Sequence, residues 1–252
     1  MRLLTLARDL SRRKARERDG QFVAEGVRTC EELARSLVEV VGVLAAPQLA
    51  ASPRGAALRE AFAARGVLVT DVTDRDFQSA AETESPQGVL AVGRIPPSRS
   101  DRLSPTGTVR VLVLDAVQDP GNVGTLIRTA AALGTDLVVA LPGTVDVWNA
   151  KVVRSAMGAH FHAPPIPSTW EGLVNICAEH RLELWGADMG GADVATVRAP
   201  ARCALVVGNE GSGLSPHVRA ALAQSVSLPI APMVESLNVA VAAGILLYQL
   251  RP

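Results

Sequence analysis

Apolar and polar positions along the chain predict two α/β regions that are separated by a linker. Before residue 94 the pattern predicts two helices, over 26–38 and 54–65, and three strands, over 41–46, 67–70 and 88–93. The segment from Arg94 to Thr108 holds three prolines and three serines and has no apolar periodicity. Such a composition is typical of a linker. We therefore expect an N-terminal domain over 1–95, a linker over 96–108 and a C-terminal domain over 109–252.

Strands and helices alternate after the linker, which is the pattern of a parallel sheet. The predicted strands are 109–115, 136–141, 182–187 and 203–208. The predicted helices are 122–133, 148–158, one between 162 and 182, one that begins at Ser215 and Pro216, and one from about 236 to 250. The longest apolar run, 237–247, is too short to span a bilayer, which requires roughly 18 apolar residues. We expect no membrane association.

Composition and charge narrow the possible functions. The 252 residues are 48% hydrophobic and 20% charged, which predicts a buried core, and only 3% aromatic, which argues against base stacking as the main way of binding nucleic acid. The net charge is zero, but seven Lys or Arg residues stand against two acids between Arg2 and Arg18. These cations, with Arg12, Arg13, Lys14 and Arg16 at the centre, either contact RNA phosphates or form a solvated helix face. Because charges come so early and no apolar leader follows, we expect a cytoplasmic protein.

The cysteines and histidines give little sign of a metal site or a disulfide. The three cysteines, Cys30, Cys177 and Cys203, are far apart and odd in number, so we expect buried free thiols. His160 and His162 would share one face of a strand, and a metal there is conceivable. Ordinary strand histidines are the simpler interpretation, and we predict no metal.

The first of three segments with candidate chemistry is 114–134, LDAVQDPGNVGTLIRTAAALG. A turn at 119–121 leads to Asn122, which suits the N-cap of the next helix. On that helix Arg128 has only small neighbours three and four residues away, which leaves room for a ligand beside its side chain. A plain surface arginine explains the same position equally well.

The second segment is 204–215, ALVVGNEGSGLS, where a strand enters a glycine-rich loop. Gly208, Gly211 and Gly213 let a backbone approach a ligand closely, but their spacing matches neither the dinucleotide fingerprint nor the P-loop. Glu210 would repel a phosphate, and it therefore favours a cationic or hydroxyl-bearing ligand.

The third segment is 227–250, SLPIAPMVESLNVAVAAGILLYQL. Ser236 is a reasonable N-cap for the last helix, and Asn238 would then lie in its first turn. The helix is apolar on every side, so we expect it to be buried in the core or against a partner chain. A plain core helix leaves Glu235, Ser236 and Asn238 unexplained.

Taken in order, these segments resemble the SpoU/TrmH family of RNA ribose 2′-O-methyltransferases in the SPOUT superfamily. Asn122, Gly124 and Arg128 match its N-x-G-x-x-x-R motif, and KVVRSAMGAHF (151–161) is similar to its R-x-S-x-G-A stretch. Its N-E-G-x-G loop and its I-P-M…S-L-N-V-S motif are matched by the following residues: Asn209, Glu210, Gly211, Gly213, Pro229, Ser236, Leu237, Asn238 and Val239. FVAEGVRTCEEL, from Phe22, resembles the substrate-binding domain that is often fused to this fold.

The resemblance implies the fold, the cofactor and the partners. It implies a C-terminal parallel sheet with a trefoil knot, a small N-terminal α/β substrate-binding domain, a homodimer, and S-adenosylmethionine as methyl donor to RNA, with rRNA favoured over tRNA. By matching position, the donor would be held by the following residues: Gly208, Asn209, Gly211, Gly213, Leu228, Ile230 and Leu237. Pro232 and Ala240 depart from the family pattern, and Pro232 removes an N–H that could serve the donor.

The same matching implies how the chemistry is divided among the side chains. Because arginine stays protonated, we expect Arg128 to bind the reacting hydroxyl or an adjacent phosphate and to stabilise developing negative charge, with a phosphate-assisted base role as the alternative. Asn122 would hold Arg128 and its loop, while Glu210, Ser236 and Asn238 would shape the site.

Two other functions are possible. One is a catalytically silent RNA-binding or ribosome-assembly protein on the same fold, against which the intact set of Asn122, Arg128, Glu210 and Asn238 weighs. The other is a nucleotide-dependent enzyme such as a dehydrogenase, against which the glycine spacing weighs.

Overall fold

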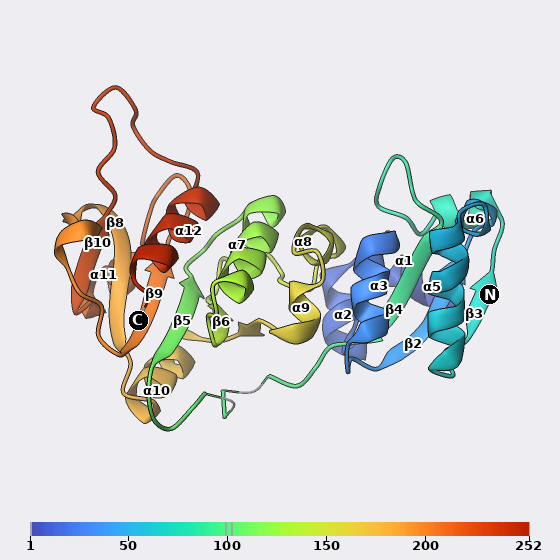
Figure 1. Ribbon diagram of the computed structural model, residues 1–252, viewed down its shortest axis with the longest axis horizontal. Coiled ribbons are helices and arrows are strands. Elements are labelled where there is room, and N and C mark those ends of the chain that lie inside the picture. Colours follow the sequence, from blue (N-terminus) through green and yellow to red (C-terminus); the bar gives the residue numbers. More distant parts are fainter. Residues whose placement is uncertain (1, 99, 102, 252) are drawn as a thin grey trace. The chain divides into compact units, whose positions relative to one another are not determined.

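The computed structural model describes residues 2–98, 100–101 and 103–251, and its contacts divide the chain into two compact units (Figure 1). The N-terminal unit consists of Met1–Pro97 and Trp148–His162, and the C-terminal unit consists of Ser98–Val147 and Ala163–Pro252. We had assigned all of 109–252 to one domain. The contacts instead group Trp148–His162 with the N-terminal unit.

The N-terminal unit is built on a four-stranded mixed sheet in the order β1-β4-β2-β3. Its strands are β1 (Gln21–Glu25), β4 (Val89–Arg94), β2 (Val40–Ala45) and β3 (Val69–Asp71). Before Trp148 its helices are α1 (Arg2–Asp9), α2 (Arg13–Asp19), α3 (Val27–Arg35), α4 (Pro47–Ala50), α5 (Pro53–Ala64) and α6 (Asp74–Gln78). The predicted elements are all present. The apolar pattern missed α1, α2, α4, α6 and β1, which are short or interrupted by charged residues.

The segment Trp148–His162 forms two short helices, α8 (Ala150–Ser155) and α9 (Ala159–His162), where we had predicted one helix over 148–158. The helix is interrupted because Met157 and Gly158 both have positive φ, 52° and 92°. His160 and His162 therefore lie on a helix, and the strand face predicted for them is wrong. Among the described residues no group of three His, Cys, Asp or Glu side chains could hold a metal ion.

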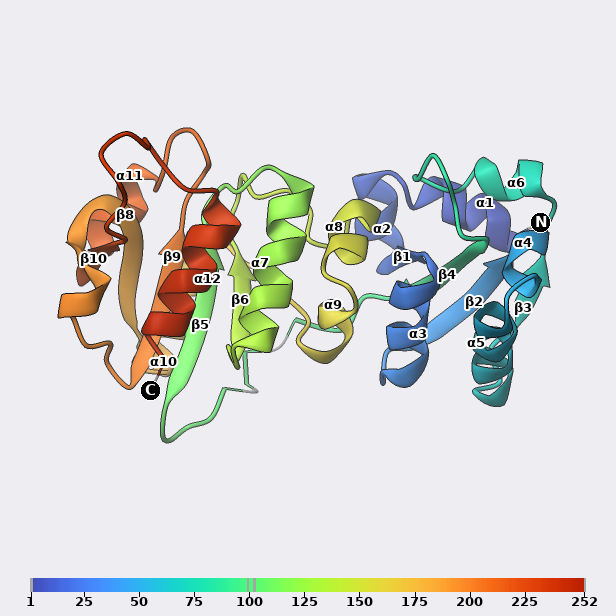
Figure 2. The same cartoon turned by 45° about the horizontal axis from the view of Figure 1, so that its top comes forward.

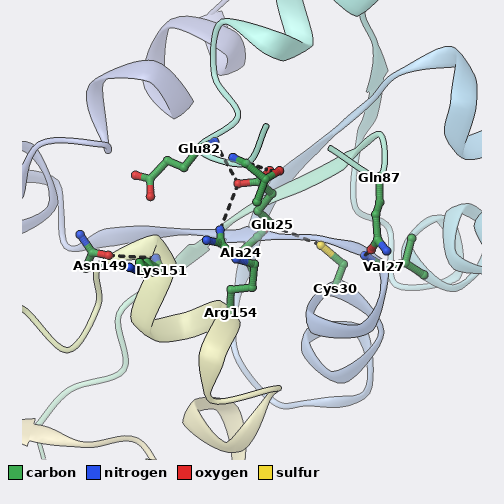
Figure 3. Close-up of polar contacts among 10 residues, drawn as sticks. Ala24, Glu25, Val27, Cys30, Glu82, Gln87, Asn149, Lys151 and Arg154 are labelled. Carbon is green, nitrogen blue, oxygen red and sulfur yellow. Dashed lines mark hydrogen bonds and ion pairs between the residues drawn. The ribbon is translucent and has the colours of Figure 1, made fainter. Parts of the chain in front are cut away.

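A buried carboxylate and an aromatic cluster fasten this segment to β1. The Phe22 ring lies 4.7 Å from Trp148 and 5.7 Å from Phe161, measured between ring centroids. Glu25, whose side chain is only 2% exposed, lies 3.5 Å from the Arg154 guanidinium (Figure 3). Backbone N–H groups at 82 and 83 also donate to the Glu25 carboxylate, at 3.0 and 3.4 Å. A buried charged group needs such partners, and the Glu25 carboxylate finds them within the N-terminal unit.

Several cations of the basic segment near the N-terminus already have partners within the protein. Arg16 is buried, and its Nη1 donates to two backbone carbonyl oxygens at 2.7 and 2.9 Å. Arg12 and Arg13 each form an ion pair with an acidic neighbour in the same segment. Arg16 is thus a structural residue, and a phosphate contact by its side chain is excluded in this conformation.

The C-terminal unit is built on a six-stranded parallel sheet in the order β10-β8-β9-β5-β6-β7, as the strand–helix alternation predicted. Its strands are β5 (Val109–Leu114), β6 (Leu137–Ala140), β7 (Ile166–Pro167), β8 (Glu183–Asp193), β9 (Arg202–Val207) and β10 (Gln224–Ser227). The outer strands β7 and β10 were not predicted, because one has two residues and the other is mostly polar. The trefoil knot stays a prediction.

The helices α7 (Pro120–Ala132) and α12 (Val239–Gln249) lie side by side against this sheet (Figures 1 and 2). A Cβ atom at Gly244 of α12 would lie only 3.3 Å from Thr129 of α7, so the two helices are closely packed. The unit also contains α10 (Trp170–Glu179), a short 3₁₀ turn (Val194–Thr196) and α11 (Pro216–Ala221). The N-caps predicted at Asn122 and Ser236 are wrong, because Asp119 caps α7 and Asn238 caps α12, whereas Ser215 is the N-cap residue of α11.

One face of α12 is exposed, although the helix is apolar on every side. Val241, Ile245 and Tyr248 are 52%, 41% and 53% exposed, while Ala243 and Leu246 on the opposite face are buried. The core therefore covers one face of α12, as expected. The opposite face presents an apolar stripe to the surface. Across the residues described, no helix is long and apolar enough to cross a membrane.

The predicted linker has no helix or strand among its described residues, with Arg99 and Arg102 outside them. Its second half is nevertheless attached to the C-terminal unit: Leu103 is buried in the core, and Arg202 donates to the carbonyl oxygens of Ser104 and Gly107 at 2.9 and 3.1 Å.

The three cysteines are free, as predicted, although Cys177 is only partly buried. Burial raises the pKa of all three thiols, to about 11 at Cys177 and about 12 at Cys203. Such thiols stay protonated and unreactive at neutral pH.

Candidate functional site

The three segments singled out in the sequence meet at one edge of the parallel sheet. They follow β5, β9 and β10, whose carboxyl ends point the same way because all strands of this sheet are parallel. Open α/β sheets bind ligands at this edge. The topology thus brings residues near 120, 210 and 236 together, although more than a hundred positions separate the first from the last.

A chain of hydrogen bonds joins all three segments through Asn122. Its Nδ2 donates to Glu210 Oε1 at 2.9 Å, and its Oδ1 accepts from Asn238 Nδ2 at 2.9 Å. Asn238 in turn caps α12, because its Oδ1 accepts from the backbone N–H of Ala240 at 2.9 Å. Asn122 therefore connects the glycine-rich loop to the start of the last helix.

The Glu210 carboxylate is held in its charged form. Partial burial acts to raise its pKa, but hydrogen bonds from Asn122 and from nearby backbone N–H groups outweigh that effect and lower the pKa. Two of these donors are the N–H groups of Gln118 and Asp119, each 3.4 Å from the carboxylate. The site therefore contains a fixed negative charge at neutral pH.

The glycine-rich loop is folded around Asn209. Its Oδ1 accepts from the N–H groups of Gly211 and Ser212 at 2.9 and 3.0 Å, and its Nδ2 donates to the Ala116 carbonyl at 2.9 Å. At Gly208 a Cβ atom would lie 2.3 Å from a backbone carbon of Gly213, which leaves no room for a side chain. Close backbone packing at Gly208 thus sets the shape of the loop.

A cleft of about 390 Å³ opens beside this loop. All seven residues predicted to bind the cofactor line it, namely Gly208, Asn209, Gly211, Gly213, Leu228, Ile230 and Leu237. Three of the five predicted catalytic residues also line it: Glu210, Ser236 and Asn238. Asn122 and Arg128 do not, although Asn122 bonds directly to two residues that do.

Comparisons with known proteins agree with this geometry. The SpoU rRNA Methylase family matches residues 110–248, more than half of the chain, and the MRM3-like substrate binding domain matches residues 5–91. The chain belongs to the SpoU rRNA methylase family. The family match covers all three segments that form the cleft and its hydrogen-bond network.

Individual SpoU proteins are similar to this chain in both sequence and structure. The 23S rRNA (guanosine(2553)-2′-O)-methyltransferase RlmP of Bacillus subtilis is 39% identical over 188 residues, which is 74% of this chain and 73% of RlmP. The SpoU methyltransferase AviRb of Streptomyces viridochromogenes, crystallised with AdoMet, has a TM-score of 0.86 at 29% identity, covering 98% of this chain and 96% of AviRb. An AdoMet-bound rRNA methyltransferase from Sinorhizobium meliloti has a TM-score of 0.86 at 25% identity, covering 99% and 94%.

Arg128 of this SpoU chain stands apart from the cleft. It lies on the exposed side of α7 and has no hydrogen-bond or ion-pair partner among the residues that the structure describes. The absence of a structural partner leaves its guanidinium available for another molecule. Its position also means that one copy of the chain does not bring Arg128 to its own cleft in this conformation.

Sequence reasoning missed three charged residues in or beside the SpoU cleft. Asp188, in the middle of β8, and Arg219, on α11, line it and form an ion pair. Asp115, which directly follows β5, is buried and accepts from the Ser215 N–H at 2.6 Å, so it holds the far end of the glycine-rich loop. The sequence does contain a signal for Asp115, which is an acidic residue directly after a buried strand. It contains none for the pairing of Asp188 with Arg219, because that contact depends on how β8 and α11 pack.

Proposed function

We propose that this chain transfers a methyl group from S-adenosylmethionine to a ribose 2′-hydroxyl of ribosomal RNA. The observation that carries the proposal is the cleft beside the Asn238–Asn122–Glu210 network, in a member of the SpoU rRNA methylase family. Support also comes from relatives that are named 23S rRNA 2′-O-methyltransferases and from neighbours crystallised with AdoMet. A catalytically silent protein would have no need of this intact network.

The cleft suits the methyl donor in size and chemistry. Its volume of about 390 Å³ is in the ordinary range for a small-molecule site, and its lining combines apolar side chains with glycine backbone. Gly208, Leu228 and Leu237 would hold the adenosine end mainly through backbone groups. When bound, the donor supplies an electrophilic methyl group on a positively charged sulfur. The fixed charge of Glu210 favours a cationic ligand of this kind.

The polar side chains of the site would position and stabilise the reacting hydroxyl. Arg128 would bind that hydroxyl or an adjacent phosphate and would stabilise the negative charge that develops on oxygen. Asn122 would fix Glu210 and Asn238 relative to each other. Ser236 lines the cleft at the start of the third segment, where it would contact the donor or the ribose.

The N-terminal unit would supply affinity for RNA. Residues 5–91 match a substrate binding domain, and the unit also carries Trp148–His162 from the middle of the chain. In the basic segment, Lys14 has no ion-pair partner among the described residues, in contrast to Arg12 and Arg13. We therefore expect Lys14, more than its neighbours, to contact phosphate.

The active form would be a homodimer that uses the exposed stripe of α12. Val241, Ile245 and Tyr248 recur at helical spacing and leave apolar surface uncovered in the single chain. A dimer would also explain Arg128, because a partner copy can bring this residue to a cleft that its own chain does not reach.

Replacement of Arg128 tests the proposed chemistry. We expect Arg128→Ala to bind donor normally and to lose 10²-fold or more in single-turnover methyl transfer, the scale of one preorganised electrostatic contact. Arg128→Lys should recover little, since a point charge does not replace a planar fork of donors. Arg198→Ala, which removes another exposed arginine of the same unit, is the matched control. Near-normal transfer by the Arg128→Ala variant would refute the assigned role.

A further inference from the structure

Among the residues that the structure describes, three charged side chains line the cleft: Asp188, Glu210 and Arg219. Two are negative and one is positive. Glu210 is held by the Asn122 network, at the side where α7 begins. Asp188 and Arg219 come from β8 and α11 and pair with each other, so they form a separate charged subsite in the same cleft.

The Arg219 guanidinium is fixed in place but only partly used. Its Nε donates to the Leu214 carbonyl at 3.1 Å, its Nη1 pairs with Asp188, and its Nη2 lies beside Gly213. The side chain is 47% exposed, and Nη2 has no polar partner among the described residues. Arginine carries five N–H donors in a planar fork, so Arg219 can hold a second carboxylate without releasing Asp188.

Asp188 is the more buried partner, with a side chain that is 19% exposed. Its Oδ1 accepts from the Gly190 N–H at 3.2 Å, while Oδ2 faces Arg219. A carboxylate has about four acceptor positions, so a further donor can reach it from the cleft.

The charges of the cleft are opposite to those of the proposed donor. S-adenosylmethionine carries two positive groups, its sulfonium and its ammonium, and one carboxylate. We propose that Arg219 binds the donor's carboxylate and that Asp188 binds its ammonium group, which leaves Glu210 near the sulfonium. The assignment rests on the proposed function. It follows from pairing the one positive side chain of the lining with the one negative group of the ligand.

The adjacency of the two side chains supports this orientation. An amino acid carries its ammonium and carboxylate groups on one carbon atom, so its binding site needs opposite charges side by side. Asp188 and Arg219 are such a pair, and Glu210 is not part of it. A surface ion pair contributes little to folding stability, so stability alone does not explain why Asp188 and Arg219 line a ligand cleft.

Calorimetry with two ligands tests the proposal without any catalysis. S-adenosylhomocysteine and 5′-methylthioadenosine share an adenosine and a neutral thioether, and only the first carries the amino-acid group. We expect Arg219→Met to bind S-adenosylhomocysteine about tenfold more weakly, the scale of one charge-assisted contact at a half-exposed site, and to bind 5′-methylthioadenosine within about twofold of the parent. Asp188→Asn should show the same selectivity. His217→Ala, on the same helix but outside the cleft, should bind both ligands normally.

The outcomes separate this proposal from the function on which it rests. If the parent chain binds neither ligand, the proposed function is wrong and the subsite with it. If the parent binds both and Arg219→Met weakens both equally, Arg219 only supports the glycine-rich loop, and the assignment is overturned. If Asp188→Asn weakens both ligands equally, Asp188 contacts the ribose hydroxyls that both ligands share, and its assignment to the ammonium group is overturned. Unchanged binding of S-adenosylhomocysteine by both variants would overturn the assignment of both residues.

Discussion

Asn122→Ala should disable the site without opening the cleft, because Asn122 lies outside the lining yet holds two residues within it. The substitution removes one hydrogen bond to a charged carboxylate and one between neutral amides. Because Glu210 and Asn238 are exposed, we take the low end of the usual range for each bond, together about 2 kcal/mol. If that energy is realised in the transition state, methyl transfer slows by about 30-fold.

The acid side of the pH profile gives a second measurement of the same contact. Asn122 helps to lower the pKa of Glu210, so its removal should raise that pKa toward the ordinary value. A carboxylate with a lowered pKa contributes its stabilising contacts above the ordinary pKa and loses them as pH falls through the lowered value. The acid limb of the Asn122→Ala profile should therefore move to higher pH. Asn122→Asp should move it further, because two carboxylates would face each other.

Single-turnover transfer at saturating donor, measured from about pH 3 to pH 8 so that the range includes the titration of Glu210, checks both effects. Thr125→Ala is the control on the same helix, since its hydroxyl donates only to the Gly121 carbonyl at 2.8 Å. An Asn122→Ala rate within about twofold of the parent, with an unmoved acid limb, would refute the idea that Asn122 connects the site.

Three further predictions concern the cleft and the proposed dimer. Gly208→Ala should weaken donor binding by tenfold or more, because its Cβ would overlap loop backbone at 2.3 Å. Gly190→Ala, which lies outside the cleft lining and whose Cβ would meet nothing within 4 Å, should bind normally, and equal calorimetric affinities of the two variants would contradict this. Ile245→Glu should convert the proposed dimer to a 26.4 kDa monomer in light scattering, and an unchanged mass would show that the α12 stripe is not the interface. If dimers share their sites, a mixture of Arg128→Ala and Asn238→Ala chains should recover about a quarter of parental activity, and no recovery would confine each site to one chain.

The alternation of short apolar runs with helical patterns sufficed to predict the parallel sheet of the C-terminal unit. Each such strand is buried on both faces and each helix has an apolar stripe, so local pattern and final environment coincide. The same reasoning failed at β7 and β10, which lie at the sheet edges. Edge strands are short or polar, and only pairing with a neighbour makes them strands.

Motif order in the sequence identified the residues of the cleft, and all seven predicted cofactor residues do line it. The local helix starts were less predictable. At α7 the predicted cap, Asn122, and the actual cap, Asp119, are equally suitable residue types. The same holds at α12 for Ser236 and Asn238, and the loop geometry decides which residue reaches the free N–H groups. At the interrupted helix, Gly158 has positive φ and a Cβ there would lie 2.4 Å from Glu32, a constraint that the local sequence does not reveal.

Tertiary structure alone decided which polar side chains are free to act. The sequence by itself placed Arg16 among exposed cations and gave Arg219 no role, but folding buries the first among carbonyl oxygens and turns the second toward the cleft. It also grouped Trp148–His162 with a unit that begins more than a hundred residues earlier. A sequence pattern reports the neighbours of a residue along the chain. Charges act over distances in space, and those distances exist only once the strands have paired and the helices have packed.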